Sequence, residues 1–111
     1  SVIMLVYLLL QSAVPANQLY AQGRSIPQDI KAEIAQNDQL VDKYTGEGNL
    51  TEAASYLHRS AHLLQSRGFN NEAAEYYSRI LEINQQLNNQ AAIQRVSNTL
   101  GGIYLDLENY E

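Results

Sequence analysis

After Ile26, apolar residues recur along the chain every three or four positions, which is the spacing of an amphipathic helix. The pattern predicts four helices, spanning about residues 27–45, 51–66, 71–87 and 90–107. No stretch alternates strictly between apolar and polar residues, so we expect no strand. Because the intervening turns are short, neighbouring helices should pack antiparallel. The sequence therefore predicts an all-α fold.

The three breaks between these helices contain residues that end one helix and begin the next. Asn49 or Thr51 should cap the second helix, and Asn70 should cap the third, because their side-chain oxygens can accept from free N–H groups. Glycine and asparagine adopt left-handed backbone dihedrals at low cost, and they stand in the breaks as Gly48, Gly68 and Asn88.

The apolar stripe of each helix mixes small and large side chains. We expect Ala53, Ala73 and Gly101 to let helix backbones approach closely, while larger residues fill the space between them. The stripe of the fourth helix consists of Ala92, Ile93, Val96, Leu100, Ile103, Tyr104 and Leu107. A single helical pair cannot bury such a stripe, so the pattern favours a stacked helical array.

Residues 1–22 differ in character from the rest of the chain. An apolar run from Val2 to Leu10 precedes small and polar residues, as in the h-region and c-region of a secretory signal peptide. Cleavage is expected after Ala16 or Ala21, with a basic n-region upstream of Ser1. An uncleaved anchor and a buried core helix are the alternatives, although a spanning helix needs about twenty apolar residues. We predict an exported protein, located in the periplasm or on the extracytoplasmic face of the inner membrane.

Composition excludes several classes of function. The chain has no cysteine, so it can form neither a disulfide nor a thiolate metal site. Its net charge is −5 and its seven basic residues form no run, which argues against nucleic-acid binding. Phosphate loops, nucleophile elbows and dinucleotide-binding turns do not occur. We therefore expect a non-enzymatic domain without a cofactor.

Two stretches resemble the tetratricopeptide repeat (TPR) family. Leu100-Gly-Gly-Ile-Tyr104 resembles the L-G-x-x-Y of the first TPR helix, and the residues from Leu107 to Glu111 resemble the turn that follows it. The segment from Gly68 to Tyr77 resembles the turn and second helix, with Ile80 in place of an alanine. Leu64 and Tyr104 occupy equivalent positions in successive repeats, and their separation is typical of extended repeats of about 40 residues.

The resemblance covers roughly residues 40–111 and implies a right-handed helical solenoid over residues 23–111, continuing past the last residue of the chain. Ala53 and Ala73 fit the same template, but their separation is only half that of Leu64 and Tyr104. The second predicted helix would therefore belong to two repeats at once. We interpret the first helix as an atypical terminal one, since terminal repeats lack a neighbour on one side.

The resemblance also implies a protein- or peptide-binding function, in which the inner sides of the first helices line a concave groove. Carried onto this chain, that pattern selects Ser55, His58, His62 and Gln65, and then Asn98, Gly102, Leu105 and Asp106.

Repeats directly after a signal look similar to the sensor regions of Bacteroidetes histidine kinases. The expected function is therefore the extracytoplasmic input part of such a kinase; a free periplasmic or secreted scaffold is the alternative. Membrane attachment would come only from a downstream helix or an uncleaved signal.

A helical enzyme domain is the rival from a different class. His58 and His62 share a helix face, and two imidazoles at that spacing can bind zinc. A third ligand at a fixed helical offset is missing, so we predict no metal site. Of the two adjacent tyrosines, Tyr77 should lie in the core and Tyr76 at a helix–helix edge. Asp38 and Asp42 are expected to form a solvated acidic face, as most such pairs do.

Overall fold

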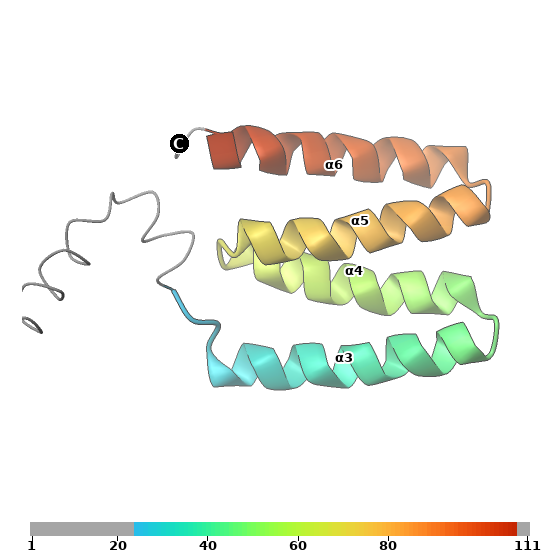
Figure 1. Ribbon diagram of the computed structural model, residues 1–111, viewed down its shortest axis with the longest axis horizontal. Coiled ribbons are helices and arrows are strands. Elements are labelled where there is room, and N and C mark those ends of the chain that lie inside the picture. The colour runs from blue at the N-terminus through green and yellow to red at the C-terminus, as the bar shows by residue number, and fades with distance from the viewer. Residues whose placement is uncertain (1–23, 109–111) are drawn as a thin grey trace, which may run out of the picture.

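The computed structural model describes residues 24–108, which form four α-helices and no strand (Figure 1). The helices are α3 (Gln28–Gly46), α4 (Leu50–Ser66), α5 (Asn70–Gln86) and α6 (Gln90–Glu108). The predicted all-α class is confirmed, and every predicted helix end lies within one residue of the observed one. The predicted signal segment, 1–22, and the turn around Tyr110 lie outside the described residues.

The four helices form a row in which each runs antiparallel to the one before it (Figure 1). The main packing contacts join α3 to α4, α4 to α5 and α5 to α6. In this arrangement α4 and α6 run in the same direction on either side of α5. Within residues 24–108, no helix combines the length and the apolar character needed to cross a membrane.

The three turns share one backbone geometry and recur at equal intervals along the chain. A left-handed residue stands in each, with φ of 75°, 84° and 56° at Gly48, Gly68 and Asn88. The following residue donates its N–H to the carbonyl five positions earlier, over 2.8–3.0 Å, and the left-handed residue donates to the carbonyl three positions earlier. These two bonds define a Schellman motif, which satisfies carbonyls that a helix end leaves free.

The helix N-termini are held in two different ways. Asn49 caps α4 and Asn89 caps α6, each accepting a bond of 3.2 Å from the N–H three residues on. The predicted cap of α5 at Asn70 is wrong, because Asn70 is already helical and Phe69 occupies the cap position without a side-chain bond. Phe69 is buried in the core and the Arg24 guanidinium lies 4.5 Å from its ring centre. Packing of Phe69 therefore fixes this helix start.

The core is continuous through all four helices. Its buried apolar members are Ile30, Val41, Ala53, Leu57, Ala61, Leu64, Phe69, Ala73, Ala74, Tyr77, Ile80, Val96, Leu100 and Ile103. The predicted small positions Ala53 and Ala73 are fully buried, and Tyr77 is buried as predicted. Alanines at the centre let α4 and α5 approach closely, so that the larger side chains around them are buried between the helices.

The predicted packing positions of α6 are only partly buried: Tyr104 of the apolar stripe and the close-approach position Gly101 are exposed, and Ile93 and Leu107 are half-buried. Gly101 is exposed, with open space where a side chain would project, and Tyr104 is 51% exposed. The buried residues of α6 are Ala92, Val96, Leu100 and Ile103. They form one face at helical spacing, directed at α5. Gly101 and Tyr104 each lie one residue, or about 100°, past that face.

Two polar contacts tie α3 to the other helices. Asn37 donates to the Ser60 hydroxyl over 3.1 Å, and both side chains are buried between α3 and α4. The Tyr76 hydroxyl of α5 donates to the Asp38 carboxylate of α3, at 3.0 and 3.1 Å from its two oxygens. Tyr76 thus lies at a helix edge as predicted. Asp38 is half-buried and bonded, which corrects the expected solvated face, whereas Asp42 is exposed.

Alanine substitutions at two glycines near the first turn test the effect of backbone conformation alone, because an added side chain makes no contact at either position. An added Cβ would meet nothing within 4 Å at either Gly46 or Gly48, but only Gly48 has a left-handed φ. We expect Gly48→Ala to lower the free energy of unfolding by about 1 kcal/mol. Gly46→Ala, the matched control, should raise it by about 0.5 kcal/mol because alanine favours helix. Urea unfolding followed by circular dichroism measures both, and shifts of the same sign would contradict the assignment.

The Tyr76–Asp38 bond predicts a specific loss of stability at high pH. Burial, and then the hydrogen bond and charge of Asp38, raise the pKa of Tyr76 from 10.0 to about 12. The folded state therefore keeps the proton longer than the unfolded state, so this stabilisation is complete below pH 10 and is lost as pH rises towards 12. Wild type should lose more urea resistance than Tyr76→Phe as the pH is raised through this range. Burial also raises the pKa of Tyr77, but both variants retain Tyr77. Parallel pH profiles would refute the role of Tyr76.

Candidate groove between α4 and α6

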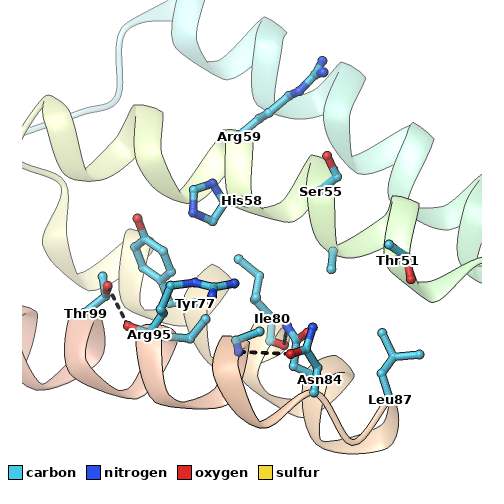
Figure 2. Close-up of a pocket in the computed structure, with 14 residues that line it drawn as sticks. Thr51, Ser55, His58, Arg59, Tyr77, Ile80, Asn84, Leu87, Arg95 and Thr99 are labelled. Atoms are coloured by element: carbon cyan, nitrogen blue, oxygen red, sulfur yellow. Dashed lines mark hydrogen bonds between the residues drawn. The ribbon is translucent and has the colours of Figure 1, made fainter.

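A groove of about 620 Å³ lies between α4 and α6, with α5 as its floor (Figure 2). Fourteen residues line it: Thr51, Ala54, Ser55, His58, Arg59, Tyr77, Ile80, Asn84, Leu87, Asn89, Ala92, Arg95, Val96 and Thr99. Because α4 and α6 run in the same direction, their side chains meet the groove in the same order along its length.

Each wall of the groove is one face of one helix. Apart from Arg59 at the rim, the α4 wall consists of Thr51, Ala54, Ser55 and His58, and the α6 wall of Ala92, Arg95, Val96 and Thr99. Both sets follow the spacing i, i+3, i+4, i+7, which gives a strip two turns long, or about 10 Å. The straight, parallel walls make the site a trough rather than an enclosed chamber.

The floor combines the apolar Ile80 with two polar residues whose side chains already have hydrogen-bond partners. Tyr77 is buried, and its hydroxyl donates to Gln65 Oε1 over 2.8 Å. Asn84 is also buried, and its Nδ2 donates to the Ile80 carbonyl over 2.9 Å. Burial raises the pKa of Tyr77, so its hydroxyl holds its proton more firmly than a solvated phenol. The floor therefore contributes shape and rigidity.

The lining contains basic residues but no Asp or Glu, although the chain has a net charge of −5. Arg95 and His58 extend into the groove from opposite walls (Figure 2). Arg59 points away from it, and its guanidinium lies 4.8 Å from the centre of the Tyr56 ring. The positive charge inside the groove is thus that of Arg95.

The two ends of the groove differ in polarity. His58, Tyr77, Arg95 and Thr99 gather at one end (Figure 2). Leu87 lies at the other end, next to the turn between α5 and α6, and it is 41% exposed. A ligand along the trough would meet the cationic Arg95 at one end and the exposed Leu87 side chain, with Thr51 beside it, at the other.

Two of the four residues predicted on α4 line this groove. Ser55 and His58 belong to its wall. His62 lies one turn further along α4, exposed, with its ring parallel to that of His58 at 6.5 Å. Gln65 lies beyond it and is half-buried, because it accepts the bond from Tyr77. The rings of His58 and Tyr77 meet edge to face at 5.9 Å, which fixes His58 against the floor.

The four residues predicted on α6 are all exposed, and none lines this groove: Asn98, Gly102, Leu105 and Asp106. Gly102 and Asp106 continue the face of Thr99 one and two turns further along α6, whereas Asn98 and Leu105 occupy the adjacent face. Arg95 and Thr99 were not selected from the sequence. Their position three residues after the buried Ala92 and Val96 is the signal that identifies them.

The paired histidines do not have the arrangement of a zinc site. Within residues 24–108, no group of three His, Cys, Asp or Glu side chains is placed to hold a metal ion. The rings of His58 and His62 are parallel within 9° and 6.5 Å apart. Zinc held by both would require nitrogens about 2.0–2.1 Å from one ion, so the rings would have to turn towards each other.

We therefore expect equimolar zinc chloride to leave the thermal unfolding midpoint unchanged. A zinc site stabilises the folded state by mass action, so binding would appear as a raised midpoint. The measurement is a circular dichroism melt with and without zinc. A zinc-dependent rise that disappears in both His58→Ala and His62→Ala would instead favour the helical enzyme alternative.

Comparisons of this chain with protein-family models, with curated proteins and with solved structures found no significant match.

Proposed function

We propose that this chain is a TPR-like module of a helical solenoid that binds a protein or peptide in the groove between α4 and α6. The observation that carries the proposal is the pair of matched helix faces that form the two walls of this groove. A trough about 10 Å long accommodates about three residues of an extended peptide. Its mixed lining offers both hydrogen bonds and apolar contact to such a ligand.

Two features support the solenoid arrangement. The Schellman turn recurs at equal intervals, at Gly48, Gly68 and Asn88, so successive helices have nearly equal length and the helices form a regular series. The Tyr76–Asp38 bond joins α5 to α3, so helices two apart in the sequence also make contact. Repeat arrays are built from interfaces between units that are close in the sequence. The resemblance to TPR sequences adds the expectation of a right-handed stack.

Binding accounts for this groove better than catalysis. The Tyr77 hydroxyl, the polar group at the floor nearest His58, is engaged with Gln65. The lining also contains no carboxylate that could orient His58 as a base. We further propose, from the sequence resemblance, that the module is the extracytoplasmic input part of a sensor histidine kinase. A free periplasmic or secreted scaffold would use the same groove, and the coding sequence downstream of Glu111 distinguishes the two.

Two neighbouring substitutions on α6 test the position of the site. Thr99→Trp places a large ring inside the groove, while Asn98→Trp places the same ring on the adjacent face. Peptides would first be selected on the full chain from a random dodecapeptide phage library. Their affinities would then be measured by fluorescence anisotropy. We expect Thr99→Trp to weaken binding at least about tenfold, equivalent to about 1.4 kcal/mol, and Asn98→Trp to change it less than about twofold.

Circular dichroism melts of both tryptophan variants provide the folding control. Binding that survives Thr99→Trp and is lost in Asn98→Trp would overturn binding in the groove and assign the site to the face shared by Asn98 and Leu105. Failure to select any peptide whose binding depends on either residue would overturn the proposed function.

A further inference from the structure

Resting on the proposed function, we infer that the ligand is an extended peptide with an internal acidic side chain, which Arg95 binds, followed or preceded closely by an aliphatic side chain, which packs on Leu87. The inference depends on three features of the groove: its charge, the direction of the Arg95 side chain and the exposed leucine at the opposite end.

Most basic side chains of this protein are occupied by its own aromatic rings. Guanidinium or ammonium groups lie 4.5–5.7 Å from ring centres in four pairs: Arg24 with Phe69, Lys43 with Tyr44, Arg59 with Tyr56 and Arg79 with Tyr76. Such cation–π contacts attract the cation to the face of the ring. Arg95 is not a member of these pairs in the described part of the chain, and it extends into the groove instead (Figure 2).

The surroundings of Arg95 favour a carboxylate from outside the chain. No Asp or Glu lines the groove, so the lining supplies no internal partner for this guanidinium. A guanidinium donates two parallel bonds to a carboxylate, with a geometry that an ammonium cannot reproduce. His58 on the opposite wall adds a ring N–H donor. The Thr99 hydroxyl at the same end donates to the Arg95 carbonyl over 3.1 Å, so the guanidinium is the main donor to a bound carboxylate.

Leu87, at the end of the groove opposite His58, determines the second ligand position. Leu87 is one of three large apolar side chains that remain exposed within residues 24–108, and it closes the end of the groove opposite His58. The segment of α6 from its cap at Asn89 to Arg95 spans about 9 Å. An extended peptide covers that distance in about three residues. The ligand should therefore place its acidic and aliphatic side chains two or three positions apart.

The charge of the whole chain excludes polyanions as the preferred ligand. Nucleic acids and anionic membranes bind through many basic side chains at once. This chain has a net charge of −5 and places one cation inside the groove. A single carboxylate, bound in a positive trough within an otherwise acidic surface, fits that distribution. The same negative surface would repel a ligand with several acidic residues outside the trough.

The test uses synthetic peptides based on the sequences selected for groove binding, acetylated and amidated at their ends. We expect these sequences to be enriched in Asp or Glu. Replacing that residue with Gln or Asn should weaken binding to the wild-type chain about tenfold and have little effect on binding to Arg95→Gln. Arg95→Glu should weaken binding of the acidic peptide further. Arg79→Glu, an exposed arginine of α5 outside the groove, is the charge-matched control and should change affinity less than about twofold.

The outcomes separate the inference from the proposed function. Groove-dependent peptides that lack acidic residues, or that bind wild type and Arg95→Gln equally, would overturn the acidic ligand and leave peptide binding intact. Binding that requires an unamidated C-terminus would assign the carboxylate to a chain end and would also overturn the inference. If Thr99→Trp leaves the affinity of the selected peptides unchanged, binding does not occur in the groove, and both proposals are overturned.

Discussion

The rest of this structure depends on one backbone constraint, a left-handed residue placed at equal intervals along the chain. A chain that ends each helix with the same Schellman turn must reverse direction by the same geometry at Gly48, Gly68 and Asn88. Helices of nearly equal length follow, so α4 and α6 lie parallel and in step on either side of α5. Without this equal spacing, two separate helices would not present matched faces to one trough.

Packing around α5 determines how far apart those faces stand. Ala53 and Ala73 are fully buried and allow close approach of α4 and α5, while Tyr77 adds bulk where α5 faces the groove. The hydroxyl of Tyr77 bonds to Gln65, and its ring contacts His58, so one buried side chain both supports the floor and orients a wall residue. The width of the groove is therefore a property of the core.

The sequence predicted the helices to within one residue because glycine and asparagine mark their ends. It also predicted the residues of α6 that are buried, which are Ala92, Val96, Leu100 and Ile103. It made the buried face too wide, because apolar spacing shows which residues can be buried but not which of them a neighbouring helix covers; Gly101 and Tyr104 were therefore misplaced. The residues predicted to form the site on α6 were taken from the TPR pattern, which assigns the same face of the first helix in every repeat to the binding surface. A groove between two helices is lined by the sides that face each other. Arg95 and Thr99 lie on that side of α6, and only the packing of the neighbouring Ala92 and Val96 reveals it.

The distribution of charge connects this packing to the ligand preference that we propose. In an acidic protein, a trough is positively charged only under two conditions. Its lining must contain no carboxylate, and at least one basic side chain must extend into it. The aromatic residues contribute to the second condition, because rings such as those of Tyr56 and Tyr76 hold neighbouring arginines on other faces. The Tyr76 hydroxyl also holds the Asp38 carboxylate at the edge between α5 and α3, away from the trough. Tyr76, which joins α5 to α3, therefore also keeps a carboxylate and an arginine away from the trough, so the packing that stabilises the fold helps to determine the charge of the groove.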